Sequence, residues 1–173
     1  MKFIYRILIL LLLLASCKTP EARQPERVQS GSFIKESAER NKKLNERERK
    51  RIEAIMAQNP EYDYKISPNG FWYHYHTKVE TDTLTPGFGD VVNFDYNIKD
   101  LNGNVIYTQA ELGTQNYAMD QEELFSGLRE GLKLMKPTES VTFLFPSQKA
   151  YGYYGDNDRI GINIPLILSL IHI

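Results

Sequence analysis

The chain has 173 residues, with 21 lysines and arginines against 22 aspartates and glutamates, so its formal net charge at pH 7 is −1. This balance, with no basic cluster interleaved with aromatic residues in the second half, argues against binding to nucleic acid. The length fits one domain of about 100 to 150 residues and an extension. A single cysteine cannot form an internal disulfide.

The first 16 residues have the pattern of a secretory signal peptide. Lys2 and Arg6 supply positive charge, residues 7–14 form an unbroken apolar run, and Ala15-Ser16 gives a small-residue approach to Cys17. The run is shorter than the ~20 residues that span a bilayer comfortably. We therefore predict export, with residues 1–16 removed.

The segment Leu14-Ala15-Ser16-Cys17 resembles a bacterial lipobox, in which cleavage leaves the cysteine as an acylated N-terminus. The resemblance implies that Cys17 is the lipidation site and carries acyl chains such as palmitate. Two chains suffice for stable attachment, at about 0.8 kcal/mol per buried methylene. We expect a lipid-anchored, periplasm-facing protein of the bacterial cell envelope. An ordinary signal peptide followed by an accidental cysteine is the alternative.

A polar linker and a charged helix follow the cysteine. Residues 17–33 are polar and contain two prolines, which predicts a flexible lipidated linker. Residues 34–59 are rich in helix formers, with Ser32 available as a cap and Asn59-Pro60 as a stop. Apolar residues are too sparse in this helix for a sustained heptad seam. The pattern favours a solvated stalk over a dimerisation helix, and the oligomeric state stays open.

Residues 60–173 form the predicted domain, in which apolar side chains first alternate with a period of two. The pattern predicts strands at 62–66, 71–79, 91–99, 105–109 and 140–145, with hairpin turns at Pro68-Asn69-Gly70 and Asn102-Gly103. The predicted fold class is α+β, an antiparallel sheet wrapped around one short helix and preceded by an N-terminal helix.

The short helix lies within the stretch from Glu123 to Gly152. Its apolar residues recur at helical spacing, at Leu124, Phe125, Leu128, Leu132 and Met135. Gly127 and Gly131 cost helix stability, which indicates a close backbone approach to a neighbour or a floor on which a ligand can lie.

An ordered series of motifs resembles the FKBP family of peptidyl-prolyl cis-trans isomerases. The matching segments are Pro86-Gly87, Gly89-Asp90, Val91–Tyr96, Asn102-Gly103, Leu124–Leu132, Met135, Leu144–Pro146, Ala150–Gly152 and Ile164-Pro165. The resemblance implies a domain that accelerates rotation about X-Pro bonds in proline-containing polypeptide clients, with no cofactor and no metal.

The resemblance also implies the site residues. Tyr151, Tyr96 and Phe125 take the catalytic positions, with the Tyr151 hydroxyl and the Phe125 backbone N–H as donors to bound carbonyl groups. The expected substrate-binding residues are Ile106, Tyr107, Leu124, Leu128 and Ile164. Ordinary core packing is the alternative for the helix and strand positions. Tyr151 differs from them, because it lies on a loop between Ala150 and Gly152, where a bulky aromatic residue indicates a functional role more than core packing.

Three positions depart from the family pattern. Tyr107 replaces an aspartate at the pocket edge and follows Ile106 instead of a phenylalanine. Leu128 replaces the tryptophan floor, and Tyr107 is expected to refill part of that space. The aromatic residue of the last strand falls on His172. A binding or chaperone module with weak or no catalysis, within an envelope complex, is therefore the alternative function.

A closer resemblance is to the gliding-motility lipoprotein subgroup of the family, the GldI-like proteins. It rests on the tyrosine-rich loop Tyr151–Asp156 and on the segment Ile160–Pro165, together with the lipobox and the helical spacer. The resemblance implies assistance to the folding of exported proteins, including an envelope motility apparatus.

Three other segments of the sequence are considered, two as metal sites and one as a foreign C-terminus. His74 and His76 share one side of a strand without an apparent third metal ligand. The segment Asp156–Asp158 favours a turn over a calcium loop, because no acid follows at the required spacing. The final hexapeptide, 168–173, resembles the translation of a transposon-end sequencing adapter, and a genuine short apolar strand is the alternative.

Overall fold

The computed structural model describes residues 30–81 and 83–173, so the predicted signal peptide, Cys17 and most of the linker lie outside the described residues. The chain divides into two compact units, Met1–Lys35 and Glu36–Ile173. The strands of the described residues all belong to the second unit. Within the described ranges, no helix is both long and apolar enough to cross a membrane.

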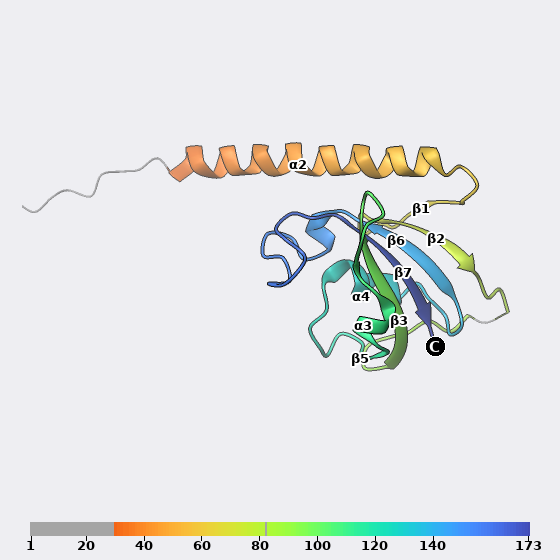
Figure 1. Ribbon diagram of the computed structural model, residues 1–173. Helices are drawn as coiled ribbons and strands as arrows, with labels where there is room; N and C mark the ends of the chain where they lie inside the picture. Colours follow the sequence, from red (N-terminus) through yellow and green to blue (C-terminus); the bar gives the residue numbers. More distant parts are fainter. Residues whose placement is uncertain (1–29, 82) are drawn as a thin grey trace, which may run out of the picture. The chain divides into compact units, whose positions relative to one another are not determined.

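The second unit contains a seven-stranded antiparallel sheet. Figure 1 shows its strands as arrows. Its strands are β1 (Lys65–Ile66), β2 (Trp72–Thr77), β3 (Val91–Asp100), β4 (Val105–Tyr107), β5 (Gln115–Ala118), β6 (Ser140–Phe145) and β7 (Leu166–His172). The order is β1-β2-β6-β7-β3-β4, and β5 pairs with the first half of β3. The predicted α+β class is confirmed.

The main core lies between one face of this sheet and helix α4 (Ser126–Leu132). Alternate residues of β3 point into it, since Val92, Phe94, Tyr96 and Ile98 are buried. Leu128 of α4 is fully buried against them.

The two glycines of α4 allow the helix to approach its neighbours closely, as their presence predicted. A Cβ atom on Gly127 would lie 2.5 Å from the carbonyl oxygen of Lys149. A Cβ atom on Gly131 would lie 3.0 Å from the Phe143 ring.

Helix α2 (Ser30–Gln58) covers the opposite face of the sheet with its C-terminal half. Ile52 is fully buried in a second cluster with Trp72, Leu101 and Leu144. The interpretation of this helix as a solvated stalk is therefore wrong for this half. The helix also begins earlier than predicted, so Ser32 lies inside it.

Four short elements differ from the prediction or were missed. Strand β4 ends at Tyr107, because helix α3 (Gln109–Leu112) begins behind a Thr108–Glu111 capping box. Strand β5 was not predicted. A 3₁₀ turn, η1 (Ser147–Lys149), leads from β6 to Tyr151.

Strand β7 contains most of the doubtful C-terminal hexapeptide and lies in the middle of the sheet. It pairs with β6 on one side and β3 on the other. Leu168, Leu170 and His172 are buried. The segment thus has the structure of an apolar strand. Its origin from an adapter stays a prediction, which sequencing of the genomic locus tests.

Candidate functional site

The hollow that contains Tyr151 lies between the start of α4 and the loop that follows η1. It has a volume of about 540 Å³. The residues that line it are Glu122, Glu123, Leu124, Phe125, Arg129, Ala150 and Tyr151. Apolar walls therefore meet a charged rim.

Tyr151 is half-buried against Phe125, with ring centroids 5.0 Å apart and planes tilted by 48°. Burial, with smaller contributions from Tyr96 and Asp156, raises the pKa of Tyr151 to about 12. The hydroxyl is therefore protonated at neutral pH. No other described residue forms a hydrogen bond with it. It is free to donate to a ligand in the hollow.

Phe125 is the residue immediately before the first turn of α4. Its ring stands edge-on to Phe145, with centroids 5.7 Å apart, so it forms a fixed wall. Its carbonyl accepts the N–H of Arg129 at 3.2 Å. The Phe125 N–H forms no hydrogen bond with the other described residues, so both donors implied by the family resemblance are free.

The structure brings Leu124, Phe125 and Tyr151 together, whereas the other five expected site residues do not line the hollow. Tyr96 is 8% exposed and Leu128 0%, so both belong to the main core. Ile106, Tyr107 and Ile164 are partly buried and pack against that core. His172 is also absent from this lining.

Sequence reasoning missed four lining residues. Glu122 and Glu123 directly precede Leu124, and Ala150 adjoins Tyr151. Arg129 was detectable in principle, because it follows Phe125 by four positions and such residues share a helix face.

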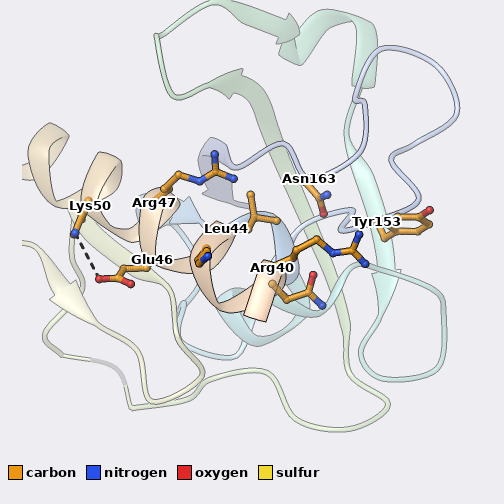
Figure 2. A pocket seen from close by; sticks show the side chains of 9 residues that line it. Arg40, Leu44, Glu46, Arg47, Lys50, Tyr153 and Asn163 are labelled. Carbon is orange, nitrogen blue, oxygen red and sulfur yellow. Dashed lines mark ion pairs between the residues drawn. The ribbon is translucent and has the colours of Figure 1, made fainter. Parts of the chain in front are cut away.

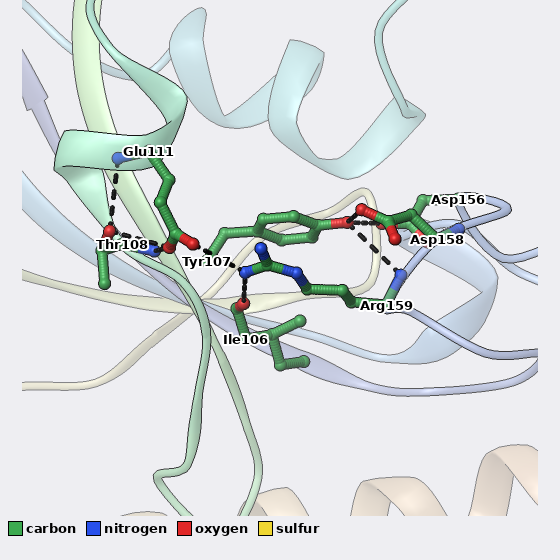
Figure 3. A network of polar contacts seen from close by, with 7 residues as sticks. All are labelled: Ile106, Tyr107, Thr108, Glu111, Asp156, Asp158 and Arg159. Atoms are coloured by element: carbon green, nitrogen blue, oxygen red, sulfur yellow. Dashed lines mark hydrogen bonds and ion pairs between the residues drawn. The ribbon is translucent and has the colours of Figure 1, made fainter.

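Tyr107 is held in a polar network that joins β4, α3 and the 156–159 turn (Figure 3). Its hydroxyl donates to Asp156 at 2.6 Å, and a carboxylate oxygen of Asp158 lies 3.1 Å away. The hydrogen bond to Asp156, reinforced by burial, raises the pKa of Tyr107 to about 12. The guanidinium of Arg159 lies 4.8 Å from the ring centroid and binds Glu111 at 2.9 Å. The hydroxyl of Tyr107 therefore braces the loop, while Tyr107 also packs against the main core that contains Leu128.

The turn at Asp156–Asp158 has the hydrogen bonds of a side-chain-capped turn. One Asp156 carboxylate oxygen accepts the backbone N–H of Asp158 at 2.9 Å and that of Ile160 at 2.8 Å. Turn chemistry, which was preferred to a calcium loop, is confirmed.

His74 and His76 take part in an aromatic cluster on β2. The ring of Tyr62 stacks on His74 with centroids 4.2 Å apart. His76 Nε2 lies 2.8 Å from the Thr142 hydroxyl. Across residues 30–81 and 83–173, no three His, Cys, Asp or Glu side chains are grouped so as to hold a metal ion.

A larger hollow of about 770 Å³ lies between α2 and the loop after Tyr151 (Figure 2). Its lining includes four basic side chains and one acidic side chain, Arg40, Lys43, Arg47, Lys50 and Glu46. Tyr153 and Asn163 also line it. None of the eight expected substrate or catalytic residues lies there.

Comparison with known proteins adds the deciding observation. A family model described as FKBP-type peptidyl-prolyl cis-trans isomerase matches residues 73–169, which is more than half of the chain. The chain belongs to the FKBP family. The match includes β2 to β6, α4 and the Tyr151 loop, so the hollow lies within the FKBP region.

One curated relative is the probable FKBP-type peptidyl-prolyl cis-trans isomerase FkpA of Neisseria meningitidis serogroup B. It is 28% identical over 120 residues, which cover 68% of this chain and 43% of the relative. The chain thus spans less than half the length of that FKBP.

Two solved structures share the fold. A peptidyl-prolyl cis-trans isomerase from Pseudomonas syringae pv. tomato superposes with a TM-score of 0.61 and 20% identity, over 76% of this chain and 92% of the other. FkpA from Escherichia coli superposes with a TM-score of 0.60 and 18% identity, over 98% of this chain and 79% of the other. At these identities the likeness shows the FKBP fold alone.

Proposed function

We propose that this FKBP accelerates cis-trans isomerisation of X-Pro bonds in exported polypeptides. The barrier of about 18–20 kcal/mol arises from lost amide resonance, and the twisted peptide is less polar than either planar form. A hollow with partly apolar walls and one or two donors therefore favours the twisted form over the planar one. Each ~1.36 kcal/mol of such preference gives about a tenfold higher rate.

The observation that carries this proposal is the Tyr151 hydroxyl. It is protonated at neutral pH and has no hydrogen-bond partner among the described residues. The centroid of the ring that carries it lies 5.0 Å from the centroid of the Phe125 ring. A prolyl ring packed on Phe125 brings its carbonyl group close to this donor. A half-buried donor without a partner loses hydrogen-bonding energy unless a ligand or water supplies an acceptor.

The decisive experiment measures the slow, proline-limited refolding phase of a client protein in the presence of this chain. The protein should begin at Lys18, because a shorter fragment from Gln58 lacks Ile52 and uncovers Trp72 and Leu144. We expect substoichiometric amounts to accelerate the slow phase. The fast, proline-independent phases of the same client serve as the internal control.

A binding module without catalysis is the second candidate. The observation in its favour is that Leu128, at the position of the family tryptophan, is fully buried and offers no surface to a prolyl ring. If excess protein binds the unfolded client without accelerating the slow phase, this function replaces the isomerase.

Lipidation at Cys17 and location in the bacterial envelope form part of the proposal, as does service to a gliding-motility apparatus. The lipobox-like sequence and the tyrosine-rich loop support them. Labelling of cells with a palmitate analogue should mark the wild-type protein and leave Cys17→Ser unlabelled. Loss of gliding in a deletion strain, restored by the wild-type protein, tests the motility role.

A further inference from the structure

The carboxylate of Glu48 on α2 is buried without a cation beside it. Glu48 is 4% exposed, and no ion pair of the described residues includes it. One carboxylate oxygen accepts the backbone N–H of Ser147 at 2.8 Å, and the other accepts the Ser147 hydroxyl at 2.7 Å. Because an unpaired buried carboxylate is costly, these two bonds strongly fix the position of Ser147 relative to α2.

Ser147 in turn holds the backbone N–H groups of the two residues that flank Tyr151. Its carbonyl oxygen accepts the N–H of Ala150 at 3.0 Å and the N–H of Gly152 at 2.9 Å. Gly152 has a φ of +60°, which turns the chain back toward η1. Ser147 therefore links Glu48 on one side to the backbone that orients Tyr151 on the other.

The same turn is held from two further directions. The side-chain amide of Asn45 on α2 donates to Gln148 at 3.0 Å. On the α4 side, the Lys149 carbonyl lies so close to Gly127 that a Cβ atom there would be 2.5 Å from it. Phe125 directly precedes α4, so the spacing of the Phe125 and Tyr151 rings depends on how the turn sits between the two helices.

We propose that Glu48 is a positioning residue for Tyr151, and that α2 is thereby part of the isomerase site without touching the substrate. The inference rests on the proposed isomerase function. Its physical basis is that a displacement of about 1 Å in a reacting group can lower a rate on the order of 10²-fold. Removing the carboxylate frees Ser147 and lets the Tyr151 loop move away from Phe125.

The kinetic test is a double-mutant cycle between Glu48→Ala and Tyr151→Phe in the chain from Lys18 onward. We expect Glu48→Ala to lower kcat/KM about three- to tenfold in the wild-type background, no more than Tyr151→Phe does, and less than twofold in the Tyr151→Phe background. Glu48→Gln, which can still bond Ser147, should restore most of the rate. Glu46→Ala is the matched control, because Glu46 is exposed on the same helix. Equal losses in both backgrounds would overturn the proposal.

A readout independent of activity separates this proposal from the isomerase function. Amide hydrogen exchange at Ala150 and Gly152 should become at least tenfold faster in Glu48→Ala and stay unchanged in Glu46→Ala. Unchanged exchange at these two amides in Glu48→Ala would overturn the positioning role of Glu48, even if activity falls. If the wild-type chain proves inactive, the isomerase function is wrong. The exchange rates at Ala150 and Gly152 still show whether Glu48 holds the Tyr151 loop in place. If Glu48→Ala does not fold, Ser147→Ala, which loses one bond, carries both measurements.

Discussion

Tyr151 lies on the loop after η1, and Tyr107 at the end of β4 bonds to Asp156 further along that loop, yet the two hydroxyl groups have different surroundings. Tyr107 donates to Asp156 at 2.6 Å, whereas the hydroxyl of Tyr151 has no partner among the described residues. A bonded hydroxyl stabilises the loop, and a free one is available to a substrate. The difference supports a structural role for Tyr107 and the proposed substrate-facing role of Tyr151.

Replacement of Tyr151 by phenylalanine should lower kcat/KM about three- to tenfold, as expected for loss of one hydrogen bond of about 0.5–1.5 kcal/mol. Tyr153→Phe is the matched control, because Tyr153 is 70% exposed on the same loop. A protease-free isomerisation assay on a proline peptide measures both variants. Equal rates for wild type and Tyr151→Phe would remove the hydroxyl from the mechanism.

The sequence could single out Tyr151, because an aromatic residue between Ala150 and Gly152 is unusual in itself. It could not reveal the role of Tyr107, whose partner Asp156 is 49 residues away in the chain. Nor could it separate pocket from core for Tyr96 and Leu128. A pocket wall and a core position both call for a largely apolar side chain, and only the packing in the structure distinguishes them.

At the scale of elements, the contact between α4 and η1 depends on a missing side chain. Gly127→Ala should destabilise the fold by about 1–3 kcal/mol, because the added methyl group meets the rigid Lys149 carbonyl at 2.5 Å. Gly131→Ala should destabilise the fold less, since its closest contact is the Phe143 ring at 3.0 Å instead of a backbone atom and alanine favours a helix. Urea denaturation of both variants gives the comparison, and a milder effect at Gly127 than at Gly131 would contradict it.

Docking of α2 on the sheet should contribute measurably to stability. Ile52→Ala should lower the free energy of unfolding by about 2–5 kcal/mol, because Ile52 is fully buried against Trp72 and Leu144. Ile34→Ala is the same chemical change on the same helix at a position that is 70% exposed, and it should have little effect. Thermal unfolding followed by circular dichroism measures both. Equal losses of stability in the two variants would show that helix propensity, and not docking of α2 on the sheet, determines the change in unfolding free energy.

The helix itself was predictable from composition and its Asn59-Pro60 stop, but its docking was not. Glu48, Ile52, Ile55 and Met56 share one face, and the single acid makes that face look solvated. A carboxylate whose partner is 99 residues away gives no local sign of burial. Helix α3 is the opposite case, since the Thr108–Glu111 capping box was present in the sequence and was overlooked.

For the whole molecule, stability should fall at both ends of the pH range. Burial, and then the charge of His76, lowers the pKa of His74 below its usual 6.5. The unfolded chain therefore binds more protons than the folded one below about pH 6.5, and stability decreases with acid. His172 is shifted in the same direction by burial. His74→Gln should weaken the fall in melting temperature between pH 7 and 5, and an unchanged slope would refute this assignment.

The alkaline limit has a separate cause. Burial raises the pKa of Tyr75 and of Tyr151 to about 12. Between the unfolded value near 10 and this folded value, only the unfolded state loses these protons, so stability should decline as pH rises through that window. Melting temperatures measured from pH 9 to 11.5 test the decline. Tyr75→Phe should reduce it, and an unaltered decline in that variant would exclude Tyr75 as a source.

Strands β3 and β6 followed from local patterns, because buried residues alternate along β3 from Val92 to Ile98 and the β6 residues from Val141 to Phe145 are all buried. Strand β5 and the Glu122–Glu123 rim did not, since their residues carry no periodic signal. Strands with a repeating apolar pattern could therefore be predicted from the sequence. The site could not, because it is made by single contacts between residues that are distant in the chain.

Trp72, the only tryptophan in the chain, lies beneath Ile52 and is 8% exposed. Its indole emission should therefore shift to longer wavelength when α2 lifts from the sheet and admits solvent. The protein therefore carries an unlabelled optical reporter of whether α2 is docked.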